Sequence, residues 1–97
     1  MALDVGVVQI DYSQARPSGA AYQYAWELMA YDDLEGDCWK VSDGGQVFIE
    51  LTYTTMANHA MEYIESKSLS STEAHQVMRW VRGLPWQGQV VMLHLGW

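Results

Sequence analysis

The sequence has little cysteine and no long apolar run. Cys38 is the single cysteine among 97 residues. A lone cysteine cannot form an internal disulfide, and it excludes a zinc site built from several cysteine ligands. No run reaches the 18 or more apolar residues of a membrane span, so we expect no contact with a membrane. The residues from Met1 to Asp4 lack the basic and apolar regions of a secretory signal, which predicts a cytoplasmic protein.

Positive charge is also scarce. Five lysines and arginines stand against twelve acids, which gives a formal net charge of -7. Residues 1–65 carry eleven acids and two bases, whereas residues 66–97 carry one acid and three bases. A nucleic-acid-binding surface needs a stripe of cations that neutralises phosphates, so we do not expect direct nucleic-acid binding.

What the chain does have is apolar and aromatic side chains. Hydrophobic residues make up 49% of the sequence and aromatic residues 12%. Burial of such a fraction can offset the conformational entropy lost on folding, so we expect a folded chain. The length suits one core, and no internal repeat or linker divides it, so the sequence predicts a single domain over residues 1–97.

The first part of the chain gives one clear strand signal and one ambiguous segment. Residues 4–12 alternate and are rich in β-branched side chains, which predicts a strand, and residues 13–19 have the composition of a loop. Residues 21–31 alternate as a strand would, and we favour a strand there. The same residues also place Ala21, Tyr24 and Leu28 on one helical stripe, so the helical alternative stays open.

The remainder of the chain predicts a hairpin, two helices and a last strand. Residues 38–54 alternate on either side of Gly44-Gly45, a pair suited to a tight hairpin turn. Helical spacing follows over residues 56–67, with Thr55 as its N-cap, and again after the capping-box sequence of residues 70–73. Residues 89–95 are apolar on both parities, which favours a central or doubly covered strand.

These elements predict an α+β fold. The expected sheet is mostly antiparallel, has about five strands in the order β-β-β-β-α-α-β, and carries two helices packed on one face. Two helices leave the other face open, and apolar residues occur on both parities of several strands. We therefore expect a partner to cover that face, and a second copy of the chain is the commonest cover. The sequence thus predicts a homodimer.

No motif in the chain points to a reaction. Neither of the common phosphate-binding glycine motifs occurs. His59 and Glu62 are three residues apart on a predicted helix, but two ligands do not make a zinc site, and we expect no metal and no cofactor. Cys38 follows an acidic residue that would raise its thiol pKa, so we expect it to be inert. His94 lies in the most apolar strand, where Glu27 or Glu50 could face it across the sheet.

Aromatic and acidic side chains are the best candidates for a working surface. The candidate binding residues are Trp26, Trp39, Trp80, Trp86 and His94, and the candidate acidic surface consists of Asp32, Asp33, Glu35 and Asp37. Exposed tryptophans commonly mark protein interfaces. The sequence therefore predicts a non-enzymatic interaction protein that acts as a homodimer. The alternative is a small-molecule-binding domain with an aromatic pocket around Trp26, Trp39 and His94, suited to cationic or flat apolar ligands.

Overall fold

The computed structural model describes residues 3–6, 16–30 and 38–96 of the chain. Helices and strands alternate irregularly along it, as in an α+β protein. The elements are α1 (Ala20–Ala30), β1 (Cys38–Asp43), β2 (Gln46–Thr52), α2 (Tyr53–Ser66), α3 (Ser71–Arg82) and β3 (Val90–Leu95). The predicted fold class and the antiparallel sheet are confirmed.

Within the described residues, the sheet has three strands in the order β1-β2-β3, and both neighbouring pairs are antiparallel. The β1–β2 hairpin turns at Gly44 and Gly45, whose φ angles of 56° and 83° lie in the region that glycine adopts without steric cost. The hairpin is therefore the one that the sequence predicted, with the same two turn residues.

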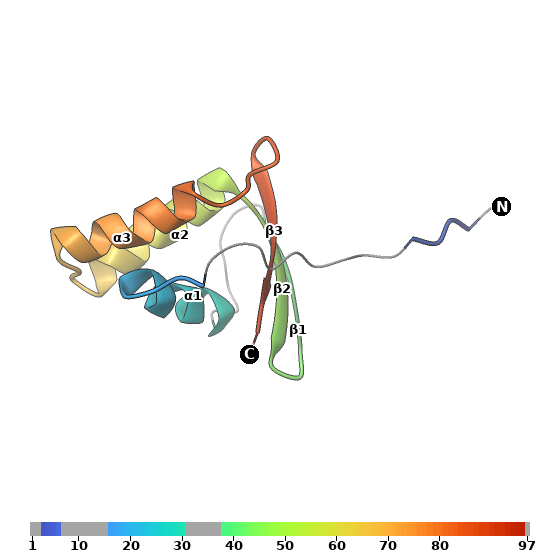
Figure 1. Ribbon diagram of the computed structural model, residues 1–97, viewed down its shortest axis with the longest axis horizontal. Helices are drawn as coiled ribbons and strands as arrows, with labels where there is room; N and C mark the ends of the chain where they lie inside the picture. Colours follow the sequence, from blue (N-terminus) through green and yellow to red (C-terminus); the bar gives the residue numbers. More distant parts are fainter. Residues whose placement is uncertain (1–2, 7–15, 31–37, 97) are drawn as a thin grey trace.

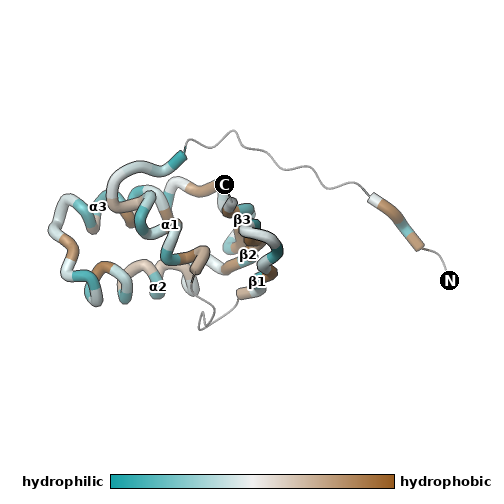
Figure 2. The backbone as a smooth tube through the Cα atoms, turned by 90° about the horizontal axis from the view of Figure 1, so that it is seen from below, coloured by the Kyte–Doolittle hydropathy of each residue, from teal (hydrophilic) through white to brown (hydrophobic). Residues whose placement is uncertain are grey.

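All three helices lie on one side of the sheet (Figures 1 and 2). α1 and α2 each pack against α3, and α2 also contacts β2. Alternate residues of the strands point toward the helices, and the core between the two layers includes Val47, Ile49, Leu51, Val91, Met56, Val77 and Val81. One face of the sheet is thus covered.

The segment that we expected to be a strand over residues 21–31 is helix α1, so that prediction was wrong. The open helical alternative is the correct one, because Ala21, Tyr24, Ala25 and Leu28 form the buried stripe. Contacts from distant parts of the chain hold both ends of the helix. The Gln76 Oε1 atom on α3 accepts a hydrogen bond of 3.2 Å from the backbone N–H of Ala20. Near the other end of α1, the Lys40 Nζ group on β1 donates to the Met29 carbonyl at 2.8 Å.

The other two helices begin with side-chain caps. The N-cap of α2 is Thr52, whose Oγ1 accepts from the backbone N–H of Thr55 at 3.2 Å; the expected cap at Thr55 lies three residues too late. α3 has the predicted capping box, in which Ser70 and Glu73 each accept a hydrogen bond from the other's backbone N–H. Both helices therefore start where a side-chain oxygen replaces the missing backbone acceptor.

Two further fold predictions were wrong, and a third lies mostly outside the described residues. The described residues form three strands and three helices in the order α-β-β-α-α-β, instead of about five strands and two helices. Among the described strands, β3 lies at an edge of the sheet and not at its centre, because β2 pairs with both β1 and β3. The strand expected over residues 4–12 falls mostly outside the described residues; residues 4–6 within it have no strand hydrogen bonding.

Candidate functional site

The face of the sheet that points away from the helices carries large apolar side chains. Two rows cross it in register: Trp39, Glu50 and Met92 form one, and Val41, Phe48 and His94 form the next. We call the seven residues of this surface the open face; they are Trp39, Val41, Phe48, Glu50, Val90, Met92 and His94.

Side chains of the open face are more exposed to solvent than side chains of the face under the helices. Trp39 is 52% exposed, Val41 43% and Met92 57%, whereas Ile49, whose side chain points to the helices from β2, is 0% exposed. A single exposed apolar residue is ordinary on a protein surface. Here Trp39 and Val41 follow each other on one face of β1, and Phe48 on β2 lies between Val41 and His94, so the apolar and aromatic side chains form a contiguous patch. Such patches mark interaction surfaces.

Phe48 and His94 pair across β2 and β3 on the open face. Their ring centroids are 4.8 Å apart and the ring planes are inclined by 43°. Both side chains are half-buried. His94 therefore lies on the surface of the sheet against an aromatic ring. Glu50 lies on the same face in the neighbouring row, but its register partner on β3 is Met92 and not His94.

Trp26 lies on a different side of the molecule. It belongs to α1, where its ring meets that of Tyr22 edge-on, with centroids 6.4 Å apart. Trp39 and His94, in contrast, lie on opposite edge strands of the open face. The structure thus brings Trp39 and His94 onto one surface and leaves Trp26 apart from them.

Trp80 and Trp86 are half-buried and pack against the core. The Trp80 ring meets the Tyr24 ring edge-on with a centroid distance of 6.1 Å. The Trp86 ring meets Tyr53 in the same way at 5.2 Å, and its Nε1–H donates to the Val81 carbonyl at 2.9 Å. Both rings therefore contribute to packing between elements.

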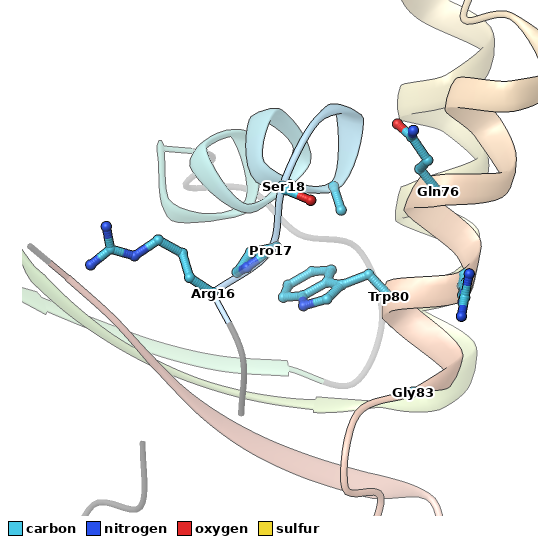
Figure 3. Close-up of a pocket in the computed structure, with 8 residues that line it drawn as sticks. Arg16, Pro17, Ser18, Gln76, Trp80 and Gly83 are labelled. Carbon is cyan, nitrogen blue, oxygen red and sulfur yellow. The ribbon is translucent and has the colours of Figure 1, made fainter. Parts of the chain in front are cut away.

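A depression lies between α3 and the segment that leads into α1 (Figure 3). Its lining includes Trp80, which faces Pro17, and the two arginines Arg16 and Arg79. The Arg16 side chain points away from Trp80 in Figure 3, and the Gln76 side chain already accepts a hydrogen bond from α1. None of Trp26, Trp39 and His94 lines this depression, so it is not the aromatic pocket of the alternative hypothesis.

The helices meet around a hydrogen-bonded tyrosine and histidine. The Tyr24 hydroxyl on α1 lies 2.9 Å from the His59 Nδ1 atom on α2, and the Tyr63 ring packs 5.1 Å from the Tyr24 ring. Burial raises the pKa of Tyr24, and the nearby Glu27 carboxylate raises it further. Burial lowers the pKa of His59 despite the opposing effect of Glu62. Tyr24 and His59 are therefore both neutral at pH 7, as suits a buried polar link between two helices.

The described parts of the chain hold no group of three or more His, Cys, Asp or Glu side chains that could bind a metal ion. His59, half of the pair considered for zinc, is hydrogen-bonded to Tyr24 instead. Cys38 lies on β1 with its side chain half-buried. The candidate acidic surface of Asp32, Asp33, Glu35 and Asp37 lies outside the described residues.

Sequence reasoning missed several members of the open face as site residues. Val41, Phe48, Val90 and Met92 were not among the candidates, although Val41 shares a strand parity with Trp39, and Val90 and Met92 share one with His94. Phe48 joins them through its register with Val41 and His94. That shared parity was the available signal, because successive side chains on a strand point to opposite faces. The Tyr24–His59 contact had no comparable signal, since it joins helices that are far apart in the sequence.

Comparison of the chain with protein-family models, with curated proteins and with solved structures finds no match in any of the three. Among the described residues, no helix is long and apolar enough to cross a membrane.

Proposed function

We propose that this protein is a non-enzymatic interaction protein that acts as a homodimer and binds a protein partner through the open face of its sheet. The observation that carries the proposal is the contiguous set of exposed apolar side chains on that face, led by Trp39, Val41 and Met92. A flat aromatic and aliphatic patch suits a protein surface better than it suits a small ligand, which needs a concave site.

Charge narrows the chemistry of the partner. Glu50 lies in the middle of the open face, between Trp39 and Met92 in register, and is exposed. The chain as a whole carries a net charge of -7. A partner with an apolar surface and a basic side chain opposite Glu50 would match this face, because opposite charges across an interface favour encounter and fix its orientation.

Two exposed tryptophans give a matched test of the partner site. We would place a photo-crosslinking phenylalanine analogue at Trp39 on the open face or at Trp26 on α1, and irradiate cells that normally contain the protein. We expect position 39 to crosslink one defined protein that position 26 does not, and Glu50→Lys to reduce that product. The same products from both positions, or none from position 39, would contradict the proposed surface.

The homodimer has its own measurement. The chain has a mass of 11.0 kDa, so light scattering at micromolar concentration should give twice that mass. A molar mass of one chain at every concentration would contradict the homodimer without touching the crosslinking result.

A further inference from the structure

The two edges of the sheet differ in how they are protected against pairing with another strand. At one edge, β1 contains the charged residues Lys40 and Asp43, and Lys40 points inward to the Met29 carbonyl. Inward-pointing charges and lysines are devices that keep an edge strand from pairing. At the other edge, the β3 sequence VVMLHL contains no aspartate, glutamate, lysine or arginine. Only β1 carries the marks of a blocked edge.

Hydrogen bonds at the start of β3 show where its backbone groups point. The N–H and C=O of Val90 both bond to Gln87, at 3.2 and 2.8 Å, whereas the Gln89 carbonyl accepts from Tyr53, just past the end of β2, at 2.7 Å. In an antiparallel ladder, alternate residues direct both backbone groups to the same neighbour. Val91 and Leu93 therefore bond toward β2, and the N–H and C=O of Met92 point toward the outer edge.

We propose that β3 pairs antiparallel with β3 of a second copy about a twofold axis near Met92 or Leu93, so that the sheet continues across the dimer. This inference rests on the proposed homodimer and specifies its contact. Met92 supplies an outward donor and acceptor at the centre of the strand, and a twofold axis gives both copies the same pair. In the part of the chain that is described, β3 has a strand neighbour on one side only.

Self-pairing of β3 is compatible with its side chains. In a twofold pairing centred on Met92 or Leu93, even-numbered residues of one copy lie opposite even-numbered residues of the other. Open-face side chains of the two copies therefore lie beside each other. No two like carboxylates or ammonium groups then face each other within the strand. Residues 66–97, which include β3, carry a net charge of +2 against -9 for residues 1–65, so this contact keeps the most acidic segments of the two copies apart.

Edge pairing would enlarge the open face. With strands about 4.8 Å apart and a rise of about 3.3 Å per residue, three strands of about six residues cover roughly 300 Å². Edge pairing joins the two open faces into one six-stranded surface of about twice that area, which leaves both faces available to the protein partner.

Two lysine substitutions on the same face separate edge pairing from face stacking. Met92 on β3 and Val41 on β1 are both exposed and both belong to the open face, but they lie on opposite edges. We expect Met92→Lys to weaken dimerisation about tenfold or more by sedimentation, which is about 1.4 kcal/mol, and Val41→Lys to leave it unchanged. Far-UV circular dichroism and urea unfolding would confirm that both variants fold.

Disulfide trapping gives a second measurement that needs no change in affinity. In a Cys38→Ser background, either Met92→Cys or Leu93→Cys should form a crosslinked dimer on mild oxidation, because opposite Cα atoms at the axis lie within disulfide range. Val41→Cys serves as the control and should stay monomeric under denaturing conditions.

The possible results either support or overturn the edge contact. The edge contact is supported if Met92→Lys dissociates the dimer while Val41→Lys does not, and if a cysteine at position 92 or 93 forms the crosslinked dimer. If the wild type is a dimer and both lysine variants weaken it equally, or neither weakens it, edge pairing is wrong. The proposed homodimer is then still supported. A monomeric wild type, as would follow if another part of the same chain covered β3, overturns both the homodimer and its edge contact.

Discussion

The two faces of the sheet are built from the same three strands but have opposite surroundings. On the inner face, Val47, Ile49, Leu51 and Val91 are at most 5% exposed beneath the helices. On the open face, Trp39, Val41 and Met92 are about half exposed although they are just as apolar. Side-chain alternation along the strands therefore supplied apolar residues to both faces of the sheet. Helices α1, α2 and α3 cover one of these faces.

An exposed apolar face has a physical cost that a covered one does not. Each apolar side chain left in water forgoes roughly 1.5–3 kcal/mol of transfer free energy that burial would provide. Association through the open face, as proposed above, would recover part of this free energy. Four predictions sharpen the comparison between the two faces.

The largest expected effect comes from shortening the inner face. Ile49→Ala removes a side chain that is 0% exposed, and the cavity left among the helices should lower the free energy of unfolding by about 2–5 kcal/mol. Val41→Ala on the open face of the neighbouring strand should lower it by less than about 0.5 kcal/mol. Urea unfolding at one protein concentration measures both, and similar losses would show that the two faces do not differ in burial.

The next effect concerns the polar link within the helical layer. Tyr24→Phe removes the hydroxyl that is bonded to His59 Nδ1, and should lower the free energy of unfolding by about 1–2 kcal/mol because a partly buried polar atom loses its partner. Tyr22→Phe, which alters an exposed ring on the same helix, is the matched control and should change it by less than about 0.5 kcal/mol. Equal effects would mean that the hydrogen bond adds nothing to stability.

A smaller effect should appear as pH falls. The pKa of His59 is lowered in the folded state, mainly by burial and in part by Lys40, against the raising effects of Glu62 and Glu27. The unfolded chain then binds a proton near its ordinary pKa of about 6.5 before the folded chain does. His59 therefore contributes stability that is present above pH 6.5 and is lost as pH falls below it.

Comparison with a variant that lacks His59 isolates that contribution. Between pH 7.5 and 5.5, the melting temperature of the wild type should fall more than that of His59→Gln. Parallel curves for the two proteins would show that His59 titrates equally in the folded and unfolded states.

The smallest effect on stability is expected on the open face itself. Val41→Thr keeps a β-branched side chain on an exposed site, so the free energy of unfolding should stay within about 0.5 kcal/mol of the wild type. Fluorescence of an apolar dye that binds exposed hydrophobic surface should decrease. A large loss of stability with unchanged dye binding would place Val41 in the core and not on the open face.

Local chemistry made part of the fold predictable. Gly44-Gly45 and the alternation around it specified the hairpin, and Ser70 with Glu73 specified the start of α3, because each signal acts within a few residues. The alternation of β1 also placed Trp39 and Val41 on one face. The homodimer, the partner and the role of the candidate site residues stay predictions.

Other features depended on contacts between distant residues. α1 alternates like a strand and becomes a helix because Tyr24 and Leu28 find a pocket on the helical layer and Gln76 and Lys40 hold its ends. The edge position of β3 likewise could not be predicted from its apolar sequence, since a strand's hydrophobicity does not say how many neighbours it has.

The sequence by itself determined the apolar content of both strand faces, the tight turn, the helix caps and the acidic balance of the chain. These follow from side-chain chemistry and from alternation over short distances. Only the tertiary structure decided which face the helices cover, that Tyr24 meets His59, and that β3 lies at an edge. Such outcomes depend on which surfaces of separate elements meet, and packing over the whole chain sets that choice.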